Sequence, residues 1–152
     1  MLKVGDKAPD FQVVDEQGQA ISLSGLKGKK VILYFYPKDD TPGCTREACA
    51  FRDDLSQFQN KNAIVLGVSK DSARSHQKFK DKYDLTFPLL VDEEGKICSA
   101  YGALSEKNMF GKKYWGVDRI TFLIDEEGVI EKIWEKVSVS DHAKEILKMI
   151  TR

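Results

Sequence analysis

The side chains in this sequence that could do covalent chemistry most directly are three cysteines, Cys44, Cys49 and Cys98. Cys44 follows a loop at residues 37–42 and falls in the first turn of a predicted helix. Unpaired backbone N–H groups and the positive end of the helix dipole favour a thiolate there, and the thiolate is the reactive form of cysteine. The alternative, from position alone, is a small apolar residue on the inner face of the helix.

The number and spacing of the possible metal ligands argue for chemistry based on free thiols. An odd number of cysteines in a chain with no recognisable secretory signal favours reduced or reactive thiols over a disulfide-framed scaffold. Zinc could in principle bind cysteines together with His76 and His142, but no pair has Cys-x-x-Cys or His-x-x-x-His spacing. We expect both histidines to be solvated. The glycines form no phosphate-loop pattern, so the sequence predicts no metal and no cofactor.

The helix that would carry Cys44 follows the clearest strand of the chain. Residues 31–36 (VILYFY) are all apolar and β-branched or aromatic, which predicts a strand buried on both faces. After the loop at 37–42, apolar residues recur at steps of four and three and predict a helix: Cys44, Ala48, Phe51, Leu55 and Phe58. Thr41 is placed to cap this helix, with Pro42 at its first position.

The rest of the chain alternates between strand and helix patterns. Strands are expected at residues 63–69, 89–91, 120–124 and 129–134, and helices at 72–83, at 95–101 and after a capping Ser140. Near the start, residues 11–14 and 20–23 flank a turn and predict a hairpin. Repeated β-α units imply parallel strands joined by right-handed crossovers, and the last hairpin adds antiparallel pairing.

These elements predict an α/β fold of the thioredoxin-like class, with a mixed central sheet flanked by helices. An N-terminal β-hairpin extension and a mid-chain insert are added to that core. We expect residues 1–152 to form a single domain, since the length suits one substantial core and no linker or repeat is visible. Ligands in such sheets sit beyond the carboxyl ends of the strands, which is where Cys44 is expected.

Composition excludes few functions, but it is typical of a soluble globular protein and does not favour a nucleic-acid-binding or membrane protein. The chain is 41% hydrophobic and 32% charged, an ordinary globular balance. Because Lys+Arg and Asp+Glu are both 24, zero net charge gives no electrostatic argument for nucleic acid or an acidic membrane surface. No segment approaches the roughly 20 apolar residues of a membrane span, and no signal peptide is evident, so we expect a cytoplasmic protein.

The residues around Cys44 form a recognisable motif. Pro37, Thr41 and Cys44 make up Pro-x-x-x-Thr-x-x-Cys, which resembles the active-site signature of peroxiredoxins. The longer string YFYPKDDTPGCTREAC resembles the bacterioferritin comigratory protein branch, also called peroxiredoxin Q. The resemblance extends from GDKAPDF near the start to RITFLID, which begins at Arg119. It implies a thiol-dependent peroxidase that reduces hydrogen peroxide and organic hydroperoxides and is regenerated by thioredoxin or a similar thiol reductant.

By that resemblance, Cys44 is the peroxidatic cysteine, which passes through a sulfenic acid. Thr41 offers its hydroxyl to the peroxide, and Pro37 shields the pocket from water. Arg119 lies beside the thiolate, where a permanent charge with several donors can stabilise developing negative charge. From the residues alone, Thr41 could be only a helix cap, Pro37 only a strand terminator and Arg119 a solvated charge at a strand start.

The same resemblance makes Cys49 the resolving cysteine of an intramolecular disulfide. Cys98 is expected to be a structural thiol and is the reserve candidate for resolution. Glu47 could join the charge network of Arg119, although an exposed glutamate in a first helical turn needs no such role. Since the resolving thiol would be in the same chain, we expect a monomer.

A disulfide between Cys44 and Cys49 cannot close on an intact helix. Cα atoms five residues apart in a helix are roughly 8.6 Å apart, and their side chains point about 140° apart. A disulfide needs Cα atoms within about 7 Å. Oxidation is therefore expected to unwind part of the helix that carries both cysteines.

Two other functions compete with a peroxidase. Thioredoxins have the same topology, but their cysteines form Cys-x-x-Cys and a proline precedes the closing hairpin, whereas residues 116–119 here read Gly-Val-Asp-Arg. A redox-sensing module that oxidises without turning over is the non-enzymatic alternative. Sustained peroxide consumption with a thiol donor would exclude it.

Overall fold

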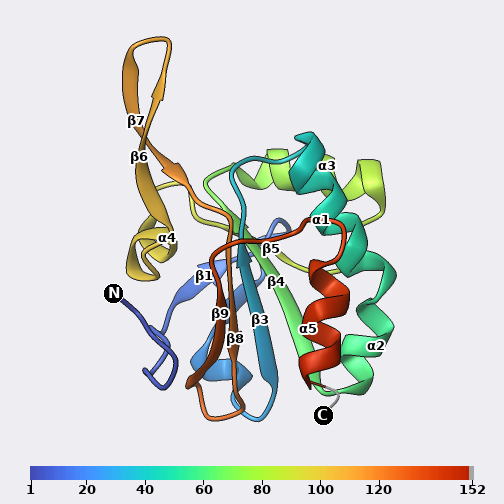
Figure 1. Cartoon of the computed structure of the whole chain (residues 1–152). Coiled ribbons are helices and arrows are strands. Elements are labelled where there is room, and N and C mark those ends of the chain that lie inside the picture. Colours follow the sequence, from blue (N-terminus) through green and yellow to red (C-terminus); the bar gives the residue numbers. More distant parts are fainter. Residues whose placement is uncertain (151–152) are drawn as a thin grey trace.

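A mixed five-stranded sheet lies at the centre of the fold (Figure 1). The structure, a computed structural model, describes residues 1–150 of the chain. The order of the strands is β5 (Leu89–Val91), β4 (Ala63–Ser69), β3 (Lys30–Phe35), β8 (Ile120–Ile124) and β9 (Ile130–Trp134). The pairs β3·β4 and β4·β5 are parallel, whereas β3·β8 and β8·β9 are antiparallel. The predicted thioredoxin-like α/β fold is confirmed.

Strand β3 is the centre of both hydrophobic cores. Its side chains alternate between the two faces of the sheet: Ile32 and Tyr34 join one buried cluster, and Leu33 and Phe35 join the other. All four are fully buried. Because each such side chain contributes roughly 1.5–3 kcal/mol when it is removed from water, this strand fixes the middle of the sheet.

Helices cover both faces of the sheet. The elements are α1 (Pro42–Asp53), α2 (Leu55–Asn60), α3 (Ala73–Tyr83), α4 (Lys96–Ala100) and α5 (His142–Ile150). Side chains of α1, α2, α3 and α5 pack into the cluster that contains Tyr34, whereas α4 packs into the cluster on the opposite face. The expected N-terminal hairpin is present as β1 (Gln12–Val14) and β2 (Ala20–Ser22), followed by a 3-10 turn at Ser24–Leu26. No helix within residues 1–150 has the length and apolar character needed to cross a membrane.

Two helix boundaries differ from the sequence prediction. The helix expected to run through Phe58 is interrupted at Asp54, where φ is −101° and ψ is 6°, so that α1 and α2 are separate. The apolar spacing continues across the break because only one residue leaves the helical conformation. The last helix begins at His142 instead of directly after Ser140, because a turn from Ser138 to Asp141 precedes it.

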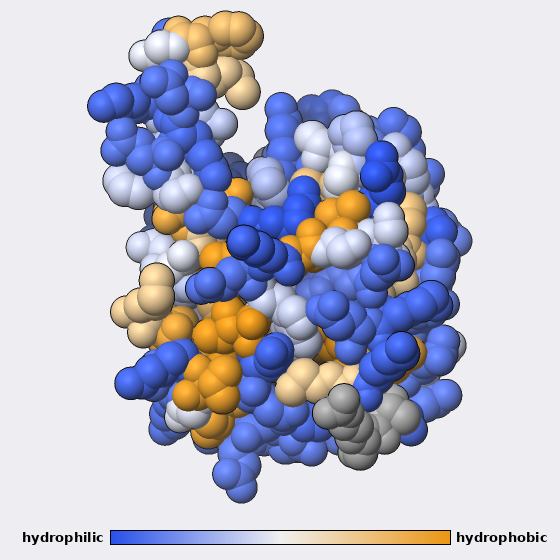
Figure 2. Space-filling view, in the orientation of Figure 1, coloured by the Kyte–Doolittle hydropathy of each residue, from blue (hydrophilic) through white to orange (hydrophobic). Residues whose placement is uncertain are grey.

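The mid-chain insert contains a hairpin that the hydrophobic pattern did not predict. β6 (Leu104–Met109) and β7 (Lys112–Val117) pair only with each other and project from the body as an arm (Figures 1 and 2). The strands are mostly polar, since no layer covers either face of the ribbon. The two strands are joined by a tight turn at the tip of the arm, where φ is positive at Phe110 (55°) and at Gly111 (81°). Phe110 is fully exposed at this tip.

Candidate functional site

The loop after β3 leads directly into the helix that carries Cys44. Thr41 is extended (φ −90°, ψ 155°) and precedes Pro42, the first residue of α1. Cys44 therefore lies in the first turn of α1, and it is 1% exposed. The predicted capping position of Thr41 is confirmed, but the capping hydrogen bond is not formed. Its hydroxyl instead donates to the carbonyl oxygen of Lys38 at 2.9 Å.

Arg119 meets Cys44 because of the antiparallel pairing of β8 with β3. Phe35 at the carboxyl end of β3 pairs with Ile120 at the start of β8. Arg119, the residue before Ile120, therefore lies at the same end of the sheet as the start of α1. The Nη2 of Arg119 donates to the Sγ of Cys44 at 3.2 Å. Gly43 permits this approach, since a Cβ at that position would lie 3.2 Å from the same Nη2.

Glu47 completes a three-residue network with Arg119 and Cys44. The Nη1 of Arg119 donates to Oε1 of Glu47 at 2.7 Å, and Glu47 is fully buried. The other carboxylate oxygen, Oε2, has no hydrogen-bond partner among the described residues. Burial raises the pKa of Glu47 to about 7, although Arg119 acts in the opposite direction. The interpretation of Glu47 as an exposed glutamate, and of Arg119 as a solvated charge, is therefore wrong.

The other two residues of the predicted set lie in the loop before α1. Pro37 is exposed directly after Tyr36, and Thr41 is half-buried at the helix start. Within residues 1–150, no hydrogen bond joins Thr41 to Cys44 or Arg119. The structure thus brings Cys44, Glu47 and Arg119 into contact and places Pro37 and Thr41 on the segment that leads to them.

All three thiols are free, and they lie in different surroundings. Cys49 is half-buried on α1, and that helix is continuous from Pro42 to Asp53 across both Cys44 and Cys49. Cys98 is fully buried on α4, in the hydrophobic cluster on the opposite face of the sheet from Cys44. Burial there raises the pKa of Cys98 well above its ordinary value. Its surroundings are those of a structural thiol.

Both histidines are buried, so the expectation that they are solvated is wrong. The Nε2 of His142 lies 2.8 Å from the hydroxyl oxygen of Thr121, and burial together with the charge of Arg119 lowers the pKa of His142 to about 4. His76 lies between the Asp39 carboxylate and a backbone carbonyl. The helical spacing of His76 with Phe79, and of His142 with Ile146, was the available signal for burial.

Comparisons with known proteins agree with this geometry. Residues 4–133 match the AhpC/TSA family. The chain is 57% identical over 146 residues to a putative peroxiredoxin Bcp of Coxiella burnetii, covering 96% of this chain and 97% of that protein. It is 49% identical over 149 residues to peroxiredoxin Bcp of Bacillus subtilis, covering 98% and 95% of the two chains.

Solved structures show the same relationship. A cysteine-to-serine variant of PrxQ from Xylella fastidiosa superimposes with a TM-score of 0.93 at 36% identity, covering 99% of this chain and 96% of that one. The bacterioferritin comigratory protein of Xanthomonas campestris, whose structures address its alkyl peroxide reduction activity, gives a TM-score of 0.87 at 38% identity, covering 93% and 90%. The chain therefore belongs to the AhpC/TSA family and, within it, to the Bcp peroxiredoxins, enzymes that reduce peroxides with a cysteine thiol.

Proposed function

We propose that Cys44 is the thiol that attacks the peroxide. The observation that carries this assignment is the 3.2 Å contact between its Sγ and the Nη2 of Arg119, in the first turn of α1. A permanent cation and a helix N-terminus both favour the thiolate form of this cysteine. The thiolate would attack the terminal oxygen, and the O–O bond would break. Cys44 becomes a sulfenic acid, and the departing alkoxide or hydroxide takes up a proton.

Arg119 would stabilise the negative charge that develops on the leaving oxygen. Its Nη1 is fixed by Glu47, so the orientation of the guanidinium is set before the peroxide binds. Preorganised donors of this kind need no rearrangement during the reaction, which is why they lower barriers strongly. Glu47 in this scheme positions Arg119 and does not touch the peroxide.

Thr41 and Pro37 would complete the pocket. The Thr41 hydroxyl donates its hydrogen to Lys38, which leaves the lone pairs of its oxygen free to accept a hydrogen bond from the peroxide. Pro37 has no N–H and would restrict access of water at the mouth of the site. These two roles rest on the motif and on the position of both residues in the loop before α1.

Cys49 would resolve the sulfenic acid. Its thiol displaces hydroxide from Cys44, giving a Cys44–Cys49 disulfide and one molecule of water. A thiol reductant, thioredoxin or a similar protein, would then reduce this disulfide by thiol–disulfide exchange. Since α1 is continuous across both cysteines, the bond requires unwinding of the helix. We further propose that the chain acts as a single-domain cytoplasmic monomer, without nucleic-acid or membrane partners and without a metal or cofactor.

The test is consumption of hydrogen peroxide and of an organic hydroperoxide, coupled to thioredoxin and its reductase. We expect turnover by the natural chain and none by Cys44→Ser. Cys49→Ser should complete one rapid oxidation but fail to turn over with thioredoxin, whereas Cys98→Ser should behave as the natural chain. Full activity of Cys44→Ser would refute the assignment of the attacking thiol, and full turnover of Cys49→Ser would refute the resolving role.

A further inference from the structure

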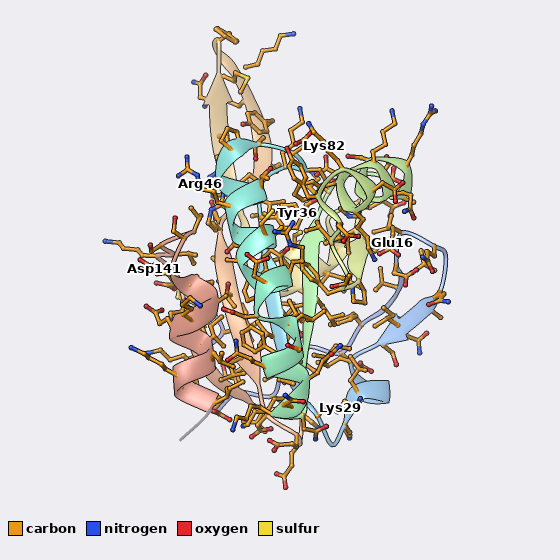
Figure 3. All side chains as sticks on the ribbon, turned by 90° about the vertical axis from the view of Figure 1, so that its right-hand side faces the viewer. Glu16, Lys29, Tyr36, Arg46, Lys82 and Asp141 are labelled. Carbon is orange, nitrogen blue, oxygen red and sulfur yellow. The ribbon has the colours of Figure 1, made fainter. Side chains whose placement is uncertain are left out.

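The loop that leads to Cys44 is held in place by the side chain of Asp39, which is 7% exposed. One carboxylate oxygen, Oδ1, accepts from the Tyr36 hydroxyl at 2.6 Å. The other, Oδ2, accepts from the Ser75 hydroxyl at 2.8 Å and lies 2.7 Å from Nδ1 of His76. In Figure 3, Tyr36 lies between α1 and α3. Asp39 thus connects the loop before α1 to Tyr36, which directly follows β3, and to α3.

The hydrogen-bond partners of His76 determine its protonation state. Its Nε2 lies 2.8 Å from the carbonyl oxygen of Leu90, which can only accept, and its Nδ1 faces the carboxylate of Asp39. A neutral imidazole has one N–H and could satisfy only one of these acceptors. Asp39 accepts hydrogen bonds from two hydroxyl groups, as an ionised carboxylate does. Both nitrogens of His76 then donate, so that His76 and Asp39 form a buried ion pair.

The surrounding charges support this state. Burial by itself would lower the pKa of His76, but the hydrogen bond and charge of Asp39 outweigh it, and the pKa lies above its ordinary value. The other groups that face His76 are the Leu90 carbonyl and the Asp71 carboxylate, which also raise the pKa, and the Tyr36 hydroxyl at 3.5 Å from Nδ1. Within residues 1–150, no lysine or arginine forms a hydrogen bond or ion pair with His76.

A metal ion is the alternative occupant, because Asp39, Asp71 and His76 offer ligand atoms within 4.8 Å of one another. The same atoms, however, are engaged with each other and with protein donors. Oδ2 of Asp71 accepts from the backbone N–H of Asp39 at 2.8 Å and from the Ser69 hydroxyl at 2.7 Å. With both His76 nitrogens acting as donors, neither has a lone pair free to bind a metal ion.

We propose that the Asp39–His76 ion pair is a positioning device for the peroxide step. It anchors the loop that carries Thr41 to α3 and to β5, and thereby fixes the first turn of α1 and the Cys44 thiol against Arg119. This inference rests on the proposed role of Cys44. A displacement of about 1 Å at a reacting group can cost on the order of a hundredfold in rate, so a rigid anchor five residues from the thiol matters.

A second, weaker tie holds the same loop at the surface. The Asp40 carboxylate accepts from Lys82 Nζ at 2.8 Å and from the Tyr83 hydroxyl at 2.7 Å. Asp40 has φ of 59°, a left-handed conformation that the loop must impose on a non-glycine residue. Exposed pairs contribute little, whereas breaking a buried pair leaves an uncompensated charge. The buried pair is therefore the principal anchor.

The ion pair gives the anchor a pH dependence. Folding raises the pKa of His76. The stability that His76 contributes to the folded state is therefore complete below the ordinary histidine pKa of about 6.5, and it is lost as pH rises through the raised value. The natural chain should consequently lose rate on the alkaline side through His76.

The experiment measures the second-order rate constant of Cys44 oxidation by hydrogen peroxide in a single turnover, without reductant, from about pH 6 to about pH 9. We expect His76→Gln to slow this step about tenfold or more at neutral pH and to remove the alkaline loss. Asp39→Asn should slow it similarly, and the double variant should be no slower than the slower single variant, since both act on one pair.

Lys80→Met is the matched control for lost stability. Lys80 lies on the same helix and forms an ion pair with buried Glu16 at 2.9 Å, away from the active-site loop. This variant should lower the melting temperature but leave the rate constant within about twofold.

A folded His76→Gln with the natural rate constant and pH profile would overturn the proposal. If that variant does not fold, Ser75→Ala, which removes one donor to Asp39, takes its place, and an unchanged rate and profile there would overturn the proposal equally. Failure of the natural chain to react would instead refute the role of Cys44.

Discussion

Glu47 and Arg119 form an ion pair in which the Glu47 side chain is fully buried and the Arg119 side chain is 22% exposed. The pair holds Arg119 by one nitrogen while the other contacts Cys44. The carboxylate costs free energy to bury, and its second oxygen has no partner among the described residues. This cost is the physical basis of the raised pKa of Glu47, and it makes the pair sensitive to pH.

Replacing Arg119 by alanine should slow the peroxide step by on the order of a hundredfold, because loss of one preorganised donor typically costs roughly 2.7–4 kcal/mol. The fold should survive, since Glu47 can keep a proton when its partner is removed. Stopped-flow measurement of Cys44 oxidation checks the rate, and circular dichroism checks the fold. Arg119→Lys is the control for charge without the guanidinium fork. An unchanged rate constant in Arg119→Ala would show that Arg119 has been misassigned.

Replacing Glu47 by glutamine should change how stability depends on pH. The pKa of Glu47 is raised from 4.5 to about 7. The free energy of unfolding that protonated Glu47 contributes is therefore complete below about pH 4.5 and is lost as pH rises towards 7. The loss amounts to roughly 3 kcal/mol at most. Urea unfolding of both proteins across this range should show a smaller decline for Glu47→Gln. Parallel pH profiles for the two proteins would contradict the prediction.

Replacing His142 by glutamine should reduce sensitivity to acid. The pKa of His142 is lowered from 6.5 to about 4. The free energy of unfolding that neutral His142 contributes is therefore present above about pH 6.5 and is lost as pH falls from there to about 4. Glutamine cannot be protonated in this range, yet it can still bond to the Thr121 hydroxyl. The unfolding free energy of the variant should fall less on acidification. Equal acid sensitivity of the two proteins would argue that other groups dominate.

Oxidation with one equivalent of peroxide should join Cys44 to Cys49 and reduce the helix content. Pro42 and Gly43 at the start of α1 favour such unwinding, since neither residue stabilises a helix interior. A peptide map of the oxidised protein identifies the disulfide, and circular dichroism measures the helix. Cys49→Ser provides the control that cannot form the bond. A Cys44–Cys98 disulfide, or a Cys44–Cys49 disulfide with no loss of helix, would count against this account.

Much of the fold could be predicted because its signals are local. The unbroken apolar run of β3 predicted a strand buried on both faces, and the helix start after Thr41 was recognisable from Pro42. The arm formed by β6 and β7 could not be predicted from hydrophobic pattern, because both of its faces are largely solvated and its strands have no apolar side to mark them.

The site was predictable only in part from the residues themselves. The position of Cys44 followed from the strand–loop–helix pattern, whereas Arg119 was singled out by resemblance to a family. Glu47 and His76 were misjudged because a charged or polar side chain gives no sign of burial when its partner is distant in the sequence. Glu47 meets its partner 72 residues away, and His76 meets Asp39 37 residues away.

The antiparallel seating of β8 beside β3 has a consequence for how the enzyme is made. Cys44 and Arg119 are 75 residues apart in the chain, and they meet only when β8 has been added to the sheet. During synthesis Cys44 emerges from the ribosome long before Arg119. The nascent chain therefore carries Cys44 without its cation, and in the proposed mechanism the late, long-range addition of β8 to the sheet completes the reactive site.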